Sequence, residues 1–119
     1  MKISIISASH RKNSQSKKIS SFLQNNLSNI DSKLNTYILD LADIGLPLWS
    51  PEKKDGQGIW GDTWKSISSN LNESDGFVLV VPEYGGMATP AAKNIFLLCG
   101  NGELAHKPGL IVSVSSGNG

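Results

Sequence analysis

The apolar run Ile3-Ser4-Ile5-Ile6 passes directly into the polar run Ser7-Ala8-Ser9-His10-Arg11-Lys12-Asn13-Ser14-Gln15-Ser16. The apolar run is typical of a buried strand, and helical periodicity begins at about residue 14. Unpaired backbone N–H groups at a helix N-terminus favour an anion there. The serine hydroxyls of the loop add further donors, and Arg11 adds charge-assisted hydrogen bonds. The loop therefore has the chemistry of a phosphate-binding site.

Strand-like and helix-like segments alternate along the whole chain. Strands are predicted at residues 2–6, 34–41, 77–81 and 110–114. Helices are predicted at residues 14–30 and from Asp62 to about 75. A third helix is predicted to begin at Pro90, with Thr89 as its cap, and to end at 100–102. Such alternation is typical of a parallel sheet with helices on both faces. A chain of 119 residues has the size of a single domain. We therefore predict one α/β domain over residues 1–119, with its ligand at the carboxyl ends of the strands.

Each predicted helix carries an apolar stripe that should face the sheet. The stripes consist of Ile19, Phe22, Leu23, Leu27 and Ile30, then Trp64, Ile67 and Leu71, then Ala91, Ala92, Ile95, Phe96, Leu98 and Cys99. The run from Phe77 to Val81 is apolar throughout and meets Pro82, so we predict a central strand that stops there. Residues 43–61 form a long loop rich in glycine and proline, a kind of segment that is often functional.

Charge and composition limit the classes of partner. Residues 1–30 hold five basic residues and no acidic one, whereas the rest of the chain holds six basic and ten acidic residues. A positive excess confined to one loop and one helix fits a small anionic ligand better than nucleic acid. No apolar run is long enough for a membrane span, and the N-terminus lacks the pattern of a signal peptide. We therefore expect a cytoplasmic protein whose partners include neither nucleic acid nor a membrane.

The cysteine and histidine residues point to no metal or thiol chemistry. Cys99 is the single cysteine, which fits a reducing compartment. It falls on the apolar face of a predicted helix, where a core position is a better interpretation than a nucleophile. His10 and His106 lack the spacing of metal ligands.

The loop after the third strand reads Pro82-Glu83-Tyr84-Gly85-Gly86-Met87-Ala88-Thr89-Pro90. Its adjacent glycines let the backbone approach a flat ligand, and Tyr84 offers an aromatic ring. With Ala8-Ser9-His10-Arg11-Lys12-Asn13-Ser14, it resembles the NADPH-dependent FMN reductase family, which shows Gly-Ser-x-Arg-x-x-Ser after its first strand and Pro-Glu-Tyr-Asn-Gly after its third. The run Ser115-Ser116-Gly117-Asn118-Gly119 resembles a third family loop, so the resemblance covers the whole chain in order.

This resemblance implies a flavodoxin-like three-layer sandwich that binds FMN. The FMN phosphate would lie on Ser9, Arg11, Asn13, Ser14, Gln15 and Ser16, and the ring and ribityl chain on Pro82, Glu83, Tyr84, Gly85 and Gly86, with Ser115, Ser116 and Gly117 on the other side of the ring. NADPH would pass hydride to flavin N5, and a small-molecule acceptor such as a flavin or quinone would then be reduced. The resemblance also implies a homodimer or homotetramer and no essential acid or base from the protein.

The chain departs from the family pattern in three places. Ala8 stands where the family has a glycine, and Gly85 stands where it has an asparagine. The helix, fifth strand and last helix with which the family continues have no counterpart in this sequence. We therefore expect a sheet truncated after its fourth strand, with that strand as an exposed apolar edge.

Less specific interpretations remain open for both loops. The first could be a solvated loop in which Ser14 is an ordinary helix cap, and the glycines of the other could serve only the turn. A different class of function is a non-catalytic FMN-binding module or partner subunit, which would bind FMN without oxidising NADPH. A phosphotransfer protein is disfavoured because the chain lacks a Gly-x-x-x-x-Gly-Lys-Ser/Thr loop.

Overall fold

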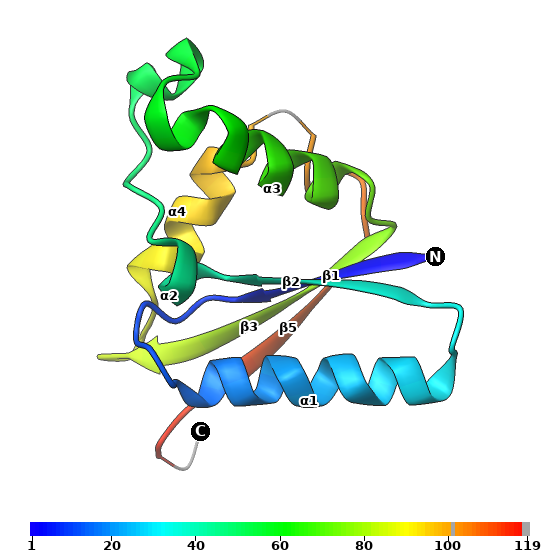
Figure 1. Ribbon diagram of the computed structural model, residues 1–119. Helices are drawn as coiled ribbons and strands as arrows, with labels where there is room; N and C mark the ends of the chain where they lie inside the picture. Colours follow the sequence, from blue (N-terminus) through cyan, green and yellow to red (C-terminus); the bar gives the residue numbers. More distant parts are fainter. Residues whose placement is uncertain (101, 118–119) are drawn as a thin grey trace.

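The computed structural model describes residues 1–100 and 102–117. A parallel sheet lies between α1 on one side and α3 and α4 on the other (Figure 1). The strands are β1 (Lys2–Ser7), β2 (Asn35–Asp40), β3 (Gly76–Tyr84), β4 (Met87–Ala88) and β5 (Gly109–Val114). The helices are α1 (Gln15–Ile30), α2 (Leu41–Ile44), α3 (Asp62–Asn72) and α4 (Pro90–Leu98), with two 3-10 turns, η1 (Pro51–Asp55) and η2 (Gly58–Trp60). This α/β architecture is the one that the sequence predicts.

The strand order places β1 and β3 at the centre of the sheet. The order is β2-β1-β3-β5, all parallel, and β4 pairs antiparallel with the end of β3. In the register, Ile5 of β1 lies opposite Ile38 on one side and Val78 on the other. Because all four main strands point the same way, the loops after β1, β3 and β5 emerge at one edge of the sheet.

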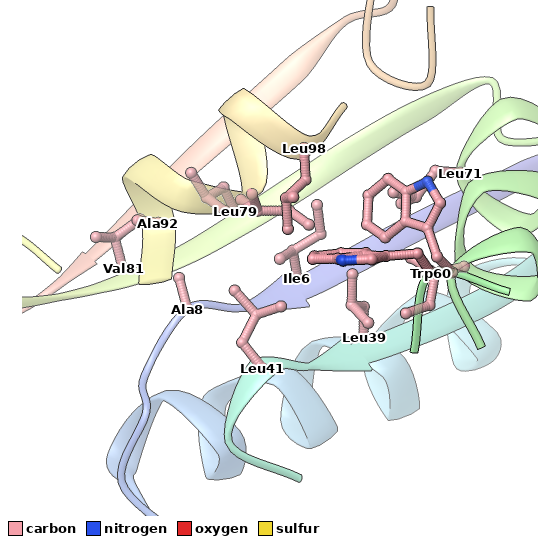
Figure 2. Packing of buried hydrophobic residues seen from close by; sticks show 13 residues of the cluster. Ile6, Ala8, Leu39, Leu41, Trp60, Leu71, Leu79, Val81, Ala92 and Leu98 are labelled. Carbon is pink, nitrogen blue, oxygen red and sulfur yellow. The ribbon is translucent and has the colours of Figure 1, made fainter. Parts of the chain in front are cut away.

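Two apolar layers hold the helices against the sheet. Under α1, the side chains of Ile5, Val78 and Val80 are buried against Ile19 and Leu23. The opposite face is larger, and Figure 2 shows Ile6, Leu39 and Leu79 of the strands packed beneath Leu98 of α4 and beside Trp60 and Leu71. Burying a large apolar side chain contributes roughly 1.5–3 kcal/mol, so this second layer is the main stabilising core.

The long segment between β2 and α3 is ordered against α4. The amide of buried Asn94 donates to the Pro47 carbonyl at 2.9 Å and accepts from the Trp49 N–H at 2.8 Å. The ammonium of Lys53 donates to the Leu98 carbonyl at 2.6 Å and lies 4.3 Å from the centre of the Trp64 ring. A cation at a helix C-terminus also complements the helix dipole. The segment that the sequence predicts as a loop therefore packs against α4, and it contains the end of α2 and two 3-10 turns.

Several element boundaries differ from the sequence prediction. β3 does not stop at Pro82, because its pairing with β5 continues to Pro82 and β4 pairs with its last two residues. Gly61, and not Asp62, caps α3, since the Gly61 carbonyl accepts the first helical hydrogen bond from Lys65. α4 ends at Leu98, before the predicted 100–102, of which residue 101 lies outside the described residues.

Three side chains assigned to apolar stripes face solvent. Phe22, Ile30 and Phe96 are all exposed. Phe22 and Phe96 lie at the margins of their stripes, where helical periodicity places a residue beside the contact with the sheet. Ile30 lies at the centre of its stripe but is the last residue of α1. The remaining members of the α1 stripe, Ile19, Leu23 and Leu27, pack against the sheet as predicted.

The far edge of the sheet is apolar and open, as the sequence predicts. Among the described residues, β5 pairs only with β3. Leu110 and Ile111 of β5 are exposed, Ile111 to 68%. Within the described part of the chain, no helix is long and apolar enough to cross a membrane.

We expect substitution of Ile6 by Ala to lower the free energy of unfolding by about 2–5 kcal/mol, because Ile6 is fully buried between the sheet and α4. The control is Ile30→Ala, since Ile30 is 81% exposed and a surface change of this kind costs about 0.5 kcal/mol or less. Urea unfolding of both variants measures the difference. Equal losses would mean that the two isoleucines are equally buried, contrary to this fold.

Candidate functional site

The loop after β1 ends in a capped helix start. Ser14 is the N-cap of α1, and its hydroxyl accepts a hydrogen bond from the Lys17 N–H at 3.1 Å. Asn13, directly before it, has φ 55°, a left-handed conformation that asparagine tolerates better than most residues. The loop therefore turns sharply and presents the first N–H groups of α1 to whatever lies beyond the helix end.

Ser9 and Tyr84 join the loops after β1 and β3. The Ser9 hydroxyl lies 2.9 Å from the Tyr84 hydroxyl and accepts from the Arg11 N–H at 3.1 Å. The His10 ring stands edge-on to the Tyr84 ring, with centroids 5.2 Å apart. Tyr84 thus fixes the first loop through its hydroxyl, in addition to offering a ring face as the sequence suggested.

A pocket of about 200 Å³ lies where the loops meet. It is lined by Ser9, Arg11, Ser14, Gln15, Ser16, Pro82, Glu83, Tyr84, Val114, Ser115 and Ser116. Three segments far apart in the sequence therefore form one site at the carboxyl edge of the sheet, as the strand order requires. Ten of the residues predicted from sequence line this pocket, and Val114 is an addition that the sequence analysis did not name.

Ser16 is the polar group in this pocket that most clearly lacks a partner. The residue is 1% exposed, and its hydroxyl has no hydrogen-bond partner among the described residues. An unpaired buried hydroxyl costs about 1–3 kcal/mol. A bound acceptor at the helix N-terminus would remove that cost.

Four predicted site residues lie outside the lining of the pocket. Asn13 faces a shallow neighbouring groove along α1, and Gly86 lines an apolar hollow beside α4 and β5. Gly85 and Gly117 line neither this pocket nor those two hollows. Gly117 instead donates its N–H to the Ser115 hydroxyl at 3.1 Å. Of the run 115–119, Asn118 and Gly119 lie outside the described residues.

The two glycines form the turn between β3 and β4. Gly85 has φ 61° and Gly86 φ 77°, which is the combination that a two-residue hairpin turn needs. The Gly86 N–H donates to the Glu83 carboxylate, so that carboxylate stabilises the turn. The turn itself is therefore sufficient to explain both glycines, in agreement with the less specific interpretation of this loop.

Thr89 holds the two loops together, a role that sequence analysis assigned only in part. Its hydroxyl caps α4 by accepting from the Ala92 N–H at 3.1 Å, as its position before Pro90 predicted. The same hydroxyl also donates to the Ala8 carbonyl at 2.5 Å. Because the cap motif concerns neighbouring residues only, the contact 81 positions away left no signal in the sequence.

The basic residues near the pocket differ in whether they have an acidic partner. The ammonium of Lys17 lies 2.7 Å from Asp43 and 3.2 Å from Asp40, and these carboxylates raise the pKa of Lys17. The exposed Arg11 side chain has no hydrogen bond or ion pair to another described residue. Arg11 is therefore the cation of the pocket whose charge an anion could use.

The described residues hold no cluster of three or more His, Cys, Asp or Glu side chains that could bind a metal. Cys99 is half-buried beside the main core. Burial raises the pKa of its thiol to about 12, with the nearby Glu103 carboxylate as a smaller cause. A neutral, enclosed thiol is a poor nucleophile, which agrees with the core position predicted for it.

Comparison with known proteins identifies the family. The chain matches the family model of NADPH-dependent FMN reductase over residues 1–119, and it belongs to this family. No curated protein sequence gave a match.

Three solved structures show the same fold. They are the apo form of the NADH:FMN oxidoreductase EMOB (19% identity, TM-score 0.77), the NAD(P)H:acceptor oxidoreductase FerB from Paracoccus denitrificans (21%, 0.77) and an oxidoreductase from Corynebacterium diphtheriae (19%, 0.74). The match covers 98%, 98% and 94% of this chain, but 59%, 62% and 62% of those chains. The chain therefore has the flavodoxin-like fold and spans about three-fifths of the length of each of these three chains.

We expect Thr89→Val to lower the free energy of unfolding by about 1–3 kcal/mol, because it removes a helix cap and a buried hydrogen bond without changing side-chain size. Thr63→Val is the matched control, since Thr63 is exposed on α3. Urea unfolding compares the two. A Thr89 variant as stable as the control would show that the Thr89 contact with Ala8 is not stabilising.

We expect Cys99 to resist alkylation in the folded protein at pH 8.5. A thiol with a pKa of about 12 is almost wholly protonated there, whereas an ordinary thiol with a pKa of about 8.5 is half ionised. The rate of reaction with iodoacetamide measures the thiolate fraction, and the same chain in urea gives the reference rate. Equal rates in the folded and unfolded chain would contradict the burial of Cys99.

Proposed function

We propose that this chain forms the FMN-binding part of an NAD(P)H-dependent flavin oxidoreductase. The observation that carries the proposal is the meeting of three loops around the partnerless Ser16 hydroxyl and the unpaired Arg11 side chain. A phosphate monoester suits this site, because its oxygens accept hydrogen bonds from hydroxyls, from the first N–H groups of a helix and from a guanidinium. Family membership supports FMN as the molecule that carries this phosphate.

The phosphate end of FMN would lie on the loop after β1. Ser14 and Ser16 would donate hydroxyl protons, with the backbone N–H groups of Gln15 and Ser16 beside them. The Ser14 hydroxyl already accepts from Lys17, so its own proton remains for a ligand. Capping α1 and donating to a phosphate are therefore compatible roles for the Ser14 hydroxyl.

The ring end of FMN would lie between the loops after β3 and β5. Pro82 and Tyr84 line the pocket from one side, and Ser115 and Ser116 line it from the other. The apolar hollow beside α4 shares Pro82 and Glu83 with this pocket, so the two spaces are neighbours at the base of the β3–β4 hairpin. A planar ring that enters from the phosphate loop would therefore meet an apolar surface.

FMN, when bound, supplies two-electron chemistry by accepting a hydride and passing the electrons on. The residues of this chain would bind and orient the cofactor, and none of those lining the pocket needs to act as an acid or base. Lys12 and Lys18 are exposed beside the phosphate loop, where they would attract the phosphates of NADPH or NADH. We further propose a cytoplasmic homodimer or homotetramer that reduces a small-molecule acceptor, such as a flavin or a quinone.

We expect Arg11→Ala to weaken FMN binding on the order of ten- to hundredfold, the usual value of hydrogen bonds to a charged group. Riboflavin, which lacks the phosphate, should bind both proteins equally. Quenching of flavin fluorescence during titration gives both affinities, and Lys33→Ala, an exposed cation away from the pocket, serves as the control. FMN affinity unchanged in the Arg11 variant would show that the phosphate lies elsewhere.

An assay with the unsubstituted protein then distinguishes an enzyme from a non-catalytic FMN-binding module. NADPH oxidation is followed by absorbance with FMN bound and with a quinone or free flavin as acceptor. Turnover above that of free FMN supports the oxidoreductase. Binding of FMN with no gain in NADPH oxidation would indicate the non-catalytic module instead.

A further inference from the structure

A partly buried group of polar residues lies beside the loop after β1, where the start of α1 meets the sheet. It contains Ser7 at the end of β1, Asp40 at the end of β2, and Lys17 in the first turn of α1. Ser7 and Asp40 lie opposite each other in the β1–β2 register. The side chain of Asp40 is 8% exposed, whereas that of Asp43, on α2, is 54% exposed.

Asp40 connects three elements through its two oxygens. Its Oδ1 accepts from the Ala42 N–H at 3.1 Å and so caps α2. Its Oδ2 has no hydrogen-bond partner among the described residues, but it lies 3.2 Å from the ammonium of Lys17. This ion pair crosses from β2 to α1. A buried carboxylate needs such a partner, because an unpaired charge in the interior is strongly unfavourable.

Lys17 carries this connection into the phosphate loop. Its ammonium donates a hydrogen bond to Asp43 and forms an ion pair with Asp40, and its backbone N–H donates to the Ser14 hydroxyl. The next N–H, that of Lys18, donates to the Ser14 carbonyl at 3.3 Å. The ion pair with Asp40 therefore connects β2 to Lys17. The backbone N–H of Lys17 contacts the Ser14 hydroxyl, and Ser16 is its neighbour in the chain.

We infer that Asp40 is a positioning residue for the first turn of α1, residues 14–17, and through it for the bound anion. The identity of that anion as the FMN phosphate rests on the proposed function. Asp43 makes the shorter contact to the same ammonium, but it is exposed and lies outside the sheet. Its carboxylate therefore does not anchor Lys17 to a strand.

If Asp40 positions the anion, its removal should weaken anion binding, whereas electrostatics alone predicts stronger binding. Asp40→Asn deletes a negative charge near the phosphate site, which by Coulomb attraction would strengthen binding of an anion. Asp43→Asn deletes the same charge from the same lysine. A loss of FMN affinity in the Asp40 variant, and none in the Asp43 variant, is explained by positioning and not by charge.

The first experiment uses the flavin-free chain. Amide hydrogen exchange of Lys17 and Lys18 should be at least about tenfold faster in Asp40→Asn than in Asp43→Asn, because the turn loses its anchor to β2. Amides in the second half of α1 serve as the internal reference and should exchange equally. Equal exchange at Lys17 and Lys18 in the two variants would overturn the inference.

The second experiment titrates FMN and riboflavin into both variants. We expect Asp40→Asn to bind FMN about tenfold more weakly than Asp43→Asn, a loss of the order found when the group that orients a ligand-binding residue is removed, with riboflavin affinity unchanged. Equal losses for FMN and riboflavin would indicate general damage and contradict the inference. If the unsubstituted chain binds neither flavin, the proposed function fails, and the exchange comparison alone decides the role of Asp40.

Discussion

Parallel pairing of β1 with β3 is the interaction on which the rest of this molecule depends. It buries Ile5 and Ile6 against Val78 and Leu79 and leaves both faces of the sheet to be covered by helices. It also brings the ends of both strands to one edge, so that the loops after Ser7 and Tyr84 meet. The contact of Thr89 with Ala8 and that of Tyr84 with Ser9 are possible only because these strands lie side by side.

The pocket of this weakly charged chain combines several features that favour an anion. Its positive character does not come from clustered lysines, since Lys17, in the first turn of α1, is paired with Asp40 and Asp43. It comes from oriented dipoles, from a hydroxyl that has no partner and from one guanidinium. Fixed dipoles are favourable without reorganisation, and so the protein keeps its net charge of +1 while the loop favours a phosphate.

The open edge at β5 sets this chain apart from a closed domain. Leu110 and Ile111 are exposed, and Ile111 lines an apolar hollow between α4 and β5. The relatives with the same fold have chains of which this one spans 59–62%. The pocket that we propose for FMN is nevertheless lined by the loops after β1 and β3 and by the end of β5 with the residues that follow it, so flavin titrations test it in this chain.

The sequence alone determined the elements that depend on neighbouring residues. Apolar runs, helical periodicity and the caps at Ser14 and Thr89 involve residues within a few positions of each other, so the main strands and helices followed from local patterns. Ten lining residues of the pocket followed from these patterns and a family resemblance. Only the tertiary structure decided what depends on distant partners. The continuation of β3 through Pro82, the exposure of Ile30, the contact of Tyr84 with Ser9 and the ion pair of Asp40 with Lys17 arise from contacts that no spacing along the chain encodes.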